Sequence, residues 1–268
     1  MRKIFIHLHI PKCGGSTISD FLSRNFGSAL GNTNSILNDY QYSSAQVSSI
    51  LDHFPNLKCL TGHKLSIDLP YGRNDLDITA FTWIRDPVDR FVSHYFYHRN
   101  HTTLVPEAKE MSLEEYIGWA LEGGHQKMYI DGQCRFLADG DFDAIRENAE
   151  NGRLLLFPLG KLEESLYTIA NKFPEHFSDW RLRTRNVSKK DQEIPDDIRE
   201  RVAPFVANDI LLHDLAIKTK TEKLSGGEVL DSRQPSGIRL PSRKIGRFLR
   251  RLGTRIEKFG EQGSGGNA

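Results

Sequence analysis

Residues 3–26 read KIFIHLHIPKCGGSTISDFLSRNF and contain the most informative pattern in the chain. The first part, 3–10, is rich in apolar and β-branched residues and predicts a strand. Residues 11–15 break that pattern with Pro and Gly. From Ser16 to Phe26 the apolar residues recur at spacings of three and four, as on one face of a helix. The N-terminus is therefore predicted to form a strand, a glycine-containing loop and a helix.

The same order of strand, turn and helix recurs further along the chain. Strands are predicted at 58–61, 77–84 and 153–158, and a helix begins near Pro87, directly after the strand at 77–84. Strands separated by crossover helices form a parallel sheet covered on both faces. We therefore predict an α/β protein with a P-loop-type parallel β-sheet flanked by helices. The other predicted helices span 43–54, 112–121, 126–137, 142–151, 161–173 and 196–217.

Composition is that of an ordinary globular protein, with 38% hydrophobic and 26% charged residues in a chain of 268. The formal net charge of +1 argues neither for nor against a polyanionic partner, so any anion site must be local, and we expect no nucleic acid partner. Three widely spaced cysteines give neither a disulfide framework nor a zinc motif. The N-terminal apolar run is too short and polar for a signal or membrane span, so we expect a cytoplasmic protein.

The pattern changes near residue 220. We predict a main domain over 1–220 and a polar linker with a basic, partly disordered tail over 221–268. Within 239–258, apolar residues recur at spacings of three and four between arginines and lysines, which predicts a cationic amphipathic helix. Such a helix is compatible with contact with an anionic membrane surface, with binding of an anionic glycan, or with docking on the domain itself.

The loop after the first strand has the features of an anion-binding loop. Its glycines let backbone N–H groups turn toward a ligand, and the following helix N-terminus adds a positive dipole end. The order of residues differs from GxxxxGK[ST], because the lysine precedes the glycines. The alternative is a turn that only joins strand to helix. The candidate binding residues are Lys12, Cys13, Gly14, Gly15, Ser16 and Thr17.

A second anion site is predicted where the strand at 77–84 ends. Arg85 follows the strand, and Ser93 lies two turns into the next helix, so both side chains are able to meet on one anion. Arg90 lies between them in the sequence. The alternative interpretation is a local ion pair between Arg85 and Asp86, with Ser93 as a small helix residue.

Both loops resemble motifs of the sulfotransferases that use 3′-phosphoadenosine-5′-phosphosulfate (PAPS). PKCGGST resembles their 5′-phosphosulfate loop, and the spacing of eight between Arg85 and Ser93 resembles their 3′-phosphate motif. The resemblance implies that Lys12 stabilises the leaving group, that residues 14–17 bind the phosphosulfate, and that Arg85 and Ser93 bind the 3′-phosphate. RDPVDRFVSHY is similar in particular to the branch that modifies carbohydrates in the Golgi and to its bacterial relatives.

His63, directly after the strand at 58–61, is the candidate general base. Transfer to a hydroxyl needs a group that accepts its proton, and a histidine with a near-neutral pKa suits this role. Gly62-His63 resembles the position of the catalytic histidine in the uronyl 2-O-sulfotransferases. A histidine at a strand end can instead be structural. His94 and His98 lie four apart, but no third residue at suitable spacing completes a metal site.

The sequence thus predicts a sulfotransferase that transfers a sulfuryl group from PAPS to a hydroxyl, most simply of a glycan or glycolipid, without a metal ion. Two alternatives stay open. A nucleotide-dependent kinase would require magnesium and ATP, and a noncatalytic nucleotide-binding adaptor would tolerate replacement of Lys12 and His63. The resemblance extends over 4–216, with weaker landmarks at 132–137, 160–164, 186–188 and 208–210.

Overall fold

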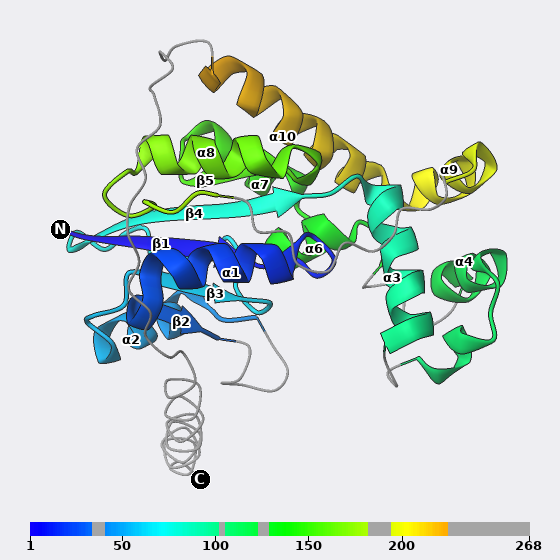
Figure 1. Cartoon of the computed structure of the whole chain (residues 1–268), viewed down its shortest axis with the longest axis horizontal. Coiled ribbons are helices and arrows are strands. Elements are labelled where there is room, and N and C mark those ends of the chain that lie inside the picture. Colours follow the sequence, from blue (N-terminus) through cyan, green and yellow to red (C-terminus); the bar gives the residue numbers. More distant parts are fainter. Residues whose placement is uncertain (34–40, 102–104, 123–128, 182–193, 225–268) are drawn as a thin grey trace, which may run out of the picture.

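The computed structural model describes residues 1–33, 41–101, 105–122, 129–181 and 194–224. Within them, parallel strands form one sheet in the order β2-β3-β1-β4-β5 (Figure 1). The predicted α/β fold with a parallel sheet is confirmed. The strands are β1 (Arg2–Leu8), β2 (Leu30–Asn32), β3 (Cys59–Gly62), β4 (Leu76–Ile84) and β5 (Leu154–Pro158).

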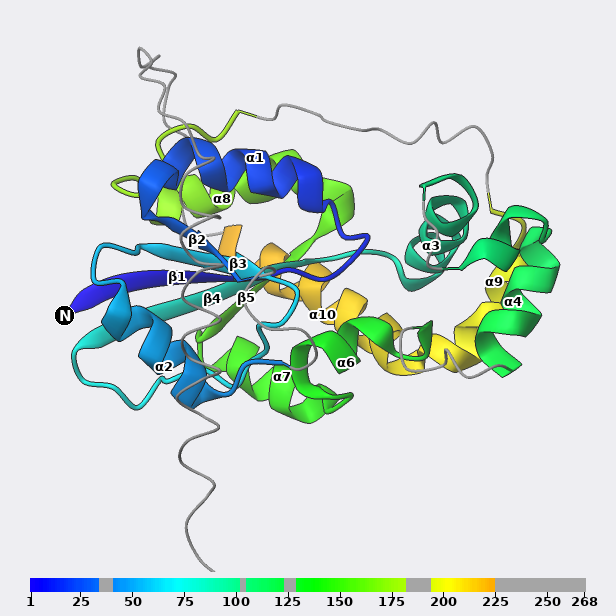
Figure 2. The ribbon, with the colours of Figure 1, turned by 90° about the horizontal axis from the view of Figure 1, so that it is seen from below.

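Helices cover both faces of the sheet because the central strand β1 is apolar on both sides. Ile4 and Ile6 point into one core and Phe5 into the other, and all three are fully buried. Figure 2 shows α1 and α8 on one side of the sheet, with α2 and α7 on the other. The helices flanking the sheet are α1 (Gly15–Phe26), α2 (Ser44–His53), α6 (Gly132–Ala138), α7 (Phe142–Glu150), α8 (Leu162–Lys172) and α10 (Ala207–Leu224).

A separate group of helices lies beyond the carboxyl ends of the strands, at the right of Figure 1. These helices pack around a third core that contains Phe91, Tyr95 and Tyr116. They are α3 (Pro87–His101), α4 (Leu113–Glu122) and α9 (Asp196–Val202). Short 3-10 turns join the larger elements at Gly27–Ala29 (η1), Pro106–Lys109 (η2), Leu159–Lys161 (η3) and Ala203–Val206 (η4). None of the described helices has the length and apolar character needed to cross a bilayer.

Two predicted helices are interrupted, and each interruption has a local cause. The helix expected over 126–137 restarts at Gly132, because Asp131 adopts the left-handed conformation with φ 45°. The helix expected over 196–217 is split by η4, where Pro204 has no N–H to continue the helical hydrogen bonds. α10 runs to Leu224 and so includes the first residues of the predicted linker. The chain from 225 onward, with the basic tail, and the landmark at 186–188 lie outside the described residues.

The starts of α6 and α10 are held together by an exchange of carboxylates. Asp209 in α10 is fully buried, and its two oxygens accept from the backbone N–H groups of Gln133 (3.0 Å) and Cys134 (2.8 Å). Asp131 in turn accepts from the N–H groups of Asn208 (2.8 Å) and Asp209 (3.1 Å). Each carboxylate thereby satisfies backbone donors that a helix N-terminus leaves unpaired. This exchange fixes where α6 begins.

Asp209→Ala is expected to lower the free energy of unfolding by about 2–3 kcal/mol, because two buried N–H groups lose a charged acceptor. Urea unfolding followed by circular dichroism measures the change. The control is Asp143→Ala, since the Asp143 side chain is 77% exposed. Its effect should stay within about 0.5 kcal/mol. Equal effects of the two substitutions would contradict a special role for the buried carboxylate.

Candidate functional site

Three segments that carry candidate residues, and the turn that begins with Leu159, follow the carboxyl ends of four parallel strands. The glycine loop follows β1, His63 follows β3, Arg85 follows β4, and Leu159 follows β5. Ligands of open parallel sheets bind at this edge, outside the strand ends. The strand order therefore brings together residues that are far apart in the sequence.

The glycine loop requires its glycines for two separate physical reasons. Gly14 has φ +80°, a left-handed conformation that glycine adopts without strain. Gly15 lies against the ring of His9, and a Cβ atom at Gly15 would be 2.0 Å from the His9 Nε2 atom. α1 begins at Gly15, so its first N–H groups and positive dipole end face the loop. Thr17 is buried in the first turn and Ser16 is exposed.

Direct contacts join the glycine loop to the segment after β4. Arg85 donates from Nη1 to the Lys12 carbonyl at 3.2 Å, and Arg90 donates from Nε to the Pro11 carbonyl at 3.2 Å. The alternative pairing of Arg85 with Asp86 is not found among the described residues, where Asp86 pairs with Arg199 at 3.5 Å. The structure thus brings Lys12 and Arg85 together.

Gln133, the second residue of α6, connects the same two loops through its buried side-chain amide. Its Nε2 donates to the Arg85 carbonyl at 2.9 Å, and its Oε1 accepts from the Arg85 N–H at 3.0 Å. The same oxygen accepts from the Cys13 thiol at 3.3 Å. Burial raises the pKa of Cys13 to about 11, so this thiol stays protonated and serves as a donor.

The site carries positive charge that no described carboxylate contacts directly, although Asp86 and Asp89 act on Arg85 and Asp209 acts on Arg90 over longer distances. Within the described ranges, Lys12, Arg85 and Arg90 form no ion pair. Burial, and then the charge of Arg85, lower the pKa of Lys12. The Lys12 Nζ atom lies 4.2 Å from the centre of the Tyr97 ring, a cation–π contact. A cluster of this kind fits an anionic ligand, because such a ligand would supply negative charge in direct contact with the three cations.

Two buried polar atoms of α3 add to this fit. Arg90 Nη2 and His94 Nε2 have no hydrogen-bond partner in the described structure, although the residues are only 2% and 3% exposed. Burial, followed by the charge of Arg90, holds the pKa of His94 well below its ordinary value. Ser93 lies next to His94 and is partly exposed. It makes no hydrogen bond to Arg85 within the described residues, so the structure does not join those two predicted partners directly.

His63 connects to the glycine loop through a stack of imidazole rings. The rings of His63 and His9 lie 4.0 Å apart, and His63 Nδ1 is 2.8 Å from the His9 carbonyl oxygen. Because a carbonyl only accepts, Nδ1 carries the proton and Nε2 keeps its lone pair. Burial lowers the pKa of His63, opposed by its bond to the His9 backbone. Neutral His63 thus has the protonation state of a general base at pH 7.

A pocket of about 540 Å³ opens beside the glycine loop, at the start of α8. Leu159 joins the two, because a Cβ atom at Gly14 would be 2.7 Å from Leu159 Cδ1. Trp180, which follows α8 in the sequence, also lines the pocket and contacts Tyr167 edge-on, with ring centres 5.1 Å apart. The remaining lining residues are Gly160, Lys161, Leu162, Glu163 and Glu164.

Sequence patterns did not identify several residues of this site. His94 and Tyr97 follow Arg90 at spacings of four and seven, so helical periodicity was a usable signal for both. Gln133 reaches the site through long-range packing, and Trp180 reaches the pocket through a turn after α8; neither residue has a periodic signal in the sequence. Among the described residues, no group of three His, Cys, Asp or Glu side chains is arranged to hold a metal ion.

Comparison with solved structures finds two sulfotransferases at low sequence identity and low structural similarity. A sulfotransferase from Alicyclobacillus acidocaldarius is 14% identical with a TM-score of 0.46, over 81% of this chain and 96% of that chain. Mouse sulfotransferase SULT7A1 complexed with PAP is 14% identical with a TM-score of 0.39, over 92% of this chain and 75% of that chain. No curated protein sequence matches the chain.

The sequence profile of the sulfotransferase family matches residues 2–136. This match covers just over half of the chain and includes the glycine loop, His63, Arg85 and Ser93. The chain therefore belongs to the sulfotransferase family, whose members transfer sulfuryl groups.

Proposed function

We propose that the protein transfers a sulfuryl group from PAPS to a hydroxyl of a carbohydrate acceptor. The observation that carries the proposal is the cluster of partly buried Lys12 and Arg85 with buried Arg90 beside the glycine loop, in which no described carboxylate forms a direct ion pair with any of the three. Membership of the sulfotransferase family supports sulfuryl transfer as the reaction. The carbohydrate acceptor is supported by the resemblance of 85–95 and of Gly62-His63 to carbohydrate sulfotransferases.

The donor is proposed to lie across the strand ends. Residues 14–17 hold the phosphosulfate through backbone N–H groups and hydroxyls, at the positive end of α1. Arg85 and Ser93 hold the 3′-phosphate, and the unpartnered Arg90 Nη2 and His94 Nε2 offer further polar contacts there. The solved complex of mouse SULT7A1 with PAP is consistent with this choice of donor.

The pocket beside Leu159 is proposed to take the adenine. Its lining includes Glu163 and Glu164, whose negative charges repel phosphate but suit the exocyclic amine of a purine. Trp180 and Tyr167 supply aromatic surface against which a base packs. Leu159 lines this pocket and also packs against Gly14, so the pocket adjoins the proposed phosphosulfate loop.

Each candidate catalytic residue has one task in the proposed reaction. His63 Nε2 takes the proton of the acceptor hydroxyl while its oxygen forms a bond to sulfur. The bond between sulfur and the bridging phosphate oxygen breaks on the opposite side, and Lys12 stabilises the negative charge that develops on this oxygen. The products are the sulfated acceptor and 3′,5′-adenosine bisphosphate (PAP), and His63 then releases its proton to solvent.

The alternatives differ in what they require of the same residues. A kinase would need Mg²⁺-ATP at the glycine loop, and an adaptor would bind nucleotide without needing Lys12 or His63. The cytoplasmic location and the membrane contact of the basic tail stay predictions from the sequence. Binding of vesicles that contain anionic lipid, compared between the full chain and a form ending at Ser236, separates membrane contact from the other roles of the tail.

Calorimetric titration with PAP tests the donor site. The wild-type protein should bind PAP, and Arg85→Ala should weaken binding by about 10- to 100-fold, because a charge-assisted contact to phosphate is lost. Arg146→Ala is the control, since Arg146 lies on the surface of α7, 49% exposed. Binding of Mg²⁺-ATP in place of PAP would instead favour the kinase.

The pH dependence of kcat/KM tests the base and the leaving-group residue. With PAPS and an unsulfated glycosaminoglycan chain as acceptor, we expect a bell-shaped profile. Its acid limb should have a midpoint below about 6.5, because the pKa of His63 is lowered and the base stays neutral down to that pH. The midpoint of its alkaline limb should lie below about pH 10.4, because the pKa of Lys12 is lowered and the lysine loses its charge at a lower pH than a free lysine does.

His63→Gln should remove the acid limb and reduce kcat by about 10²- to 10⁴-fold, with PAP affinity retained. His53→Gln is the matched control, because the exposed His53 also bonds through Nδ1 to a backbone carbonyl, that of Ser49 at 2.8 Å. An unchanged turnover in His63→Gln would exclude the histidine as the base and leave the donor assignment intact.

A further inference from the structure

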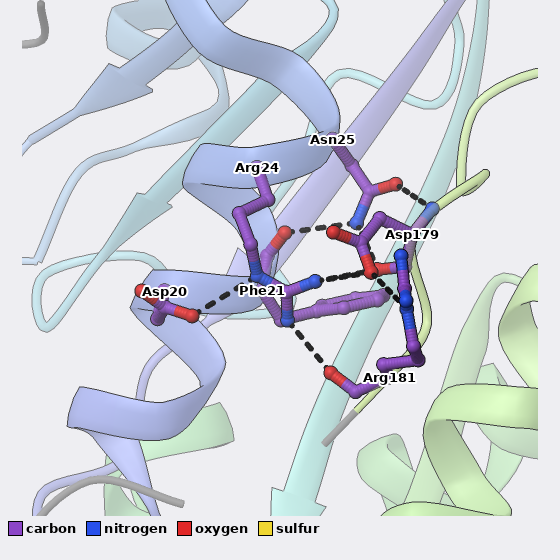
Figure 3. Close-up of polar contacts among 6 residues, drawn as sticks. All are labelled: Asp20, Phe21, Arg24, Asn25, Asp179 and Arg181. Atoms are coloured by element: carbon purple, nitrogen blue, oxygen red, sulfur yellow. Dashed lines mark hydrogen bonds and ion pairs between the residues drawn. The ribbon is translucent and has the colours of Figure 1, made fainter. Parts of the chain in front are cut away.

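Arg24, near the end of α1, binds the segment that follows α8 at several points (Figure 3). Its Nη1 lies 2.6 Å from Asp179 Oδ1 and donates to the Asp179 carbonyl at 3.1 Å. Its Nη2 donates to the Arg181 carbonyl at 2.9 Å, and its Nε donates to Asp20 Oδ2 at 3.0 Å. One guanidinium therefore holds the backbone on both sides of Trp180.

Asn25 strengthens the same attachment. Its Nδ2 donates to the carbonyls of Asp179 (3.0 Å) and Phe21 (2.9 Å), and its Oδ1 accepts from the Asp179 N–H at 2.9 Å. Phe177, two residues earlier, is 1% exposed and stacks on Phe21 with ring centres 5.4 Å apart. The segment is thus fixed to α1 by an apolar anchor followed by a polar one. We call the side chains of Arg24, Asn25 and Asp179 the α1 latch.

The α1 latch is more buried than an ordinary surface ion pair. The Arg24 and Asp179 side chains are 14% and 22% exposed, and Arg24 uses all three nitrogens of its guanidinium. Exposed pairs of this type are held weakly, whereas partly buried arginines with several acceptors keep a defined geometry. The latch therefore restricts the backbone at 179–181 far more than a solvent-exposed loop would be restricted.

Trp180 is the residue on which this restriction acts. It lines the pocket beside the glycine loop, although it is separated in sequence from every other lining residue. Its ring contacts Tyr167 of α8, while its two neighbours are bound to α1. The position of Trp180 thus depends on the distance between α1, which carries the phosphosulfate loop at its start, and α8, which forms the other wall of the pocket.

We propose that the α1 latch is a positioning device for the donor: it holds Trp180 as the wall of the nucleobase pocket, so that base affinity depends on Arg24. The inference rests on the proposed PAPS-binding function. Stacking of a base on an aromatic side chain is favourable only when the ring is held at the correct distance and orientation. Within the described part of the chain, the polar partners of Arg24 are Asp20, Asp179 and Arg181, none of which lines the pocket, so its effect on the donor is transmitted through Trp180.

A double-mutant cycle on PAP binding tests this transmission. Trp180→Leu should weaken PAP binding by about tenfold, and Arg24→Ala should weaken it to a similar extent. In the Trp180→Leu background, Arg24→Ala should have little further effect, because the residue it positions is absent. Arg24→Lys keeps the positive charge but loses the several directed donors of the guanidinium. The PAP affinity of this variant should therefore lie between that of the wild type and that of Arg24→Ala. Asp179→Asn provides a milder change if Arg24→Ala unfolds.

Inorganic pyrophosphate is the control ligand, because it probes the phosphate end alone. Its affinity should be the same in the wild type, Arg24→Ala and Trp180→Leu. Arg146→Ala is the control variant, an arginine paired with Asp143 and Glu150 on α7 and remote from α1. Thermal melts show which variants are folded at the titration temperature.

The outcomes separate this inference from the function on which it rests. Failure of the wild type to bind PAP overturns the donor assignment. PAP binding that is unchanged in folded Arg24→Ala, or independent losses that multiply in the double variant, overturn the latch. A parallel loss of pyrophosphate affinity also overturns it, because that result assigns Arg24 a general structural role.

Discussion

The geometry of the site depends on one buried amide, the side chain of Gln133. It bonds to both backbone groups of Arg85 and to the Cys13 thiol, so the loops after β1 and β4 cannot separate without breaking it. The position of Gln133 is set by two aspartates. Asp131 adopts a left-handed backbone conformation just before α6, and the carboxylate of Asp209 in α10 accepts from the Gln133 N–H. The glycine loop and the segment after β4 are therefore held together by a side chain of α6.

The positive charges of Lys12 and Arg85 favour binding of an anionic ligand more than they stabilise the free protein. Burial lowers the pKa values of Lys12 and Arg85, which shows that the protein surroundings disfavour their charged forms. The neighbouring histidines avoid the same problem by staying neutral, and burial, followed by the charge of His63, lowers the pKa of His9 to about 3. A bound dianion would relieve this repulsion, so donor binding and stability of the folded state are coupled.

The sequence predicted those parts of the molecule whose cause is local. The β1–loop–α1 unit and the helix after β4 follow from periodicity and turn residues, and Pro204 gave a usable signal for the break before α10. β2 was missed because three residues carry no periodicity, and it exists through its pairing with β3. Gln133 and Trp180 were missed because packing across the fold places them. The roles of Lys12, His63, Arg85 and Ser93 rest on motif and geometry together, and they remain predictions.

The exchange of carboxylates between α6 and α10 also sets an order of folding. α6 has seven residues, which are too few for a helix to be stable alone. Its first backbone N–H groups have their acceptor only when Asp209 is present, and Asp209 lies 76 positions beyond Gln133. During synthesis, the sheet strands and both anion-binding loops leave the ribosome before the helix that completes their connection. The connection that Gln133 makes between the two loops can therefore become rigid only after α10 has been synthesised.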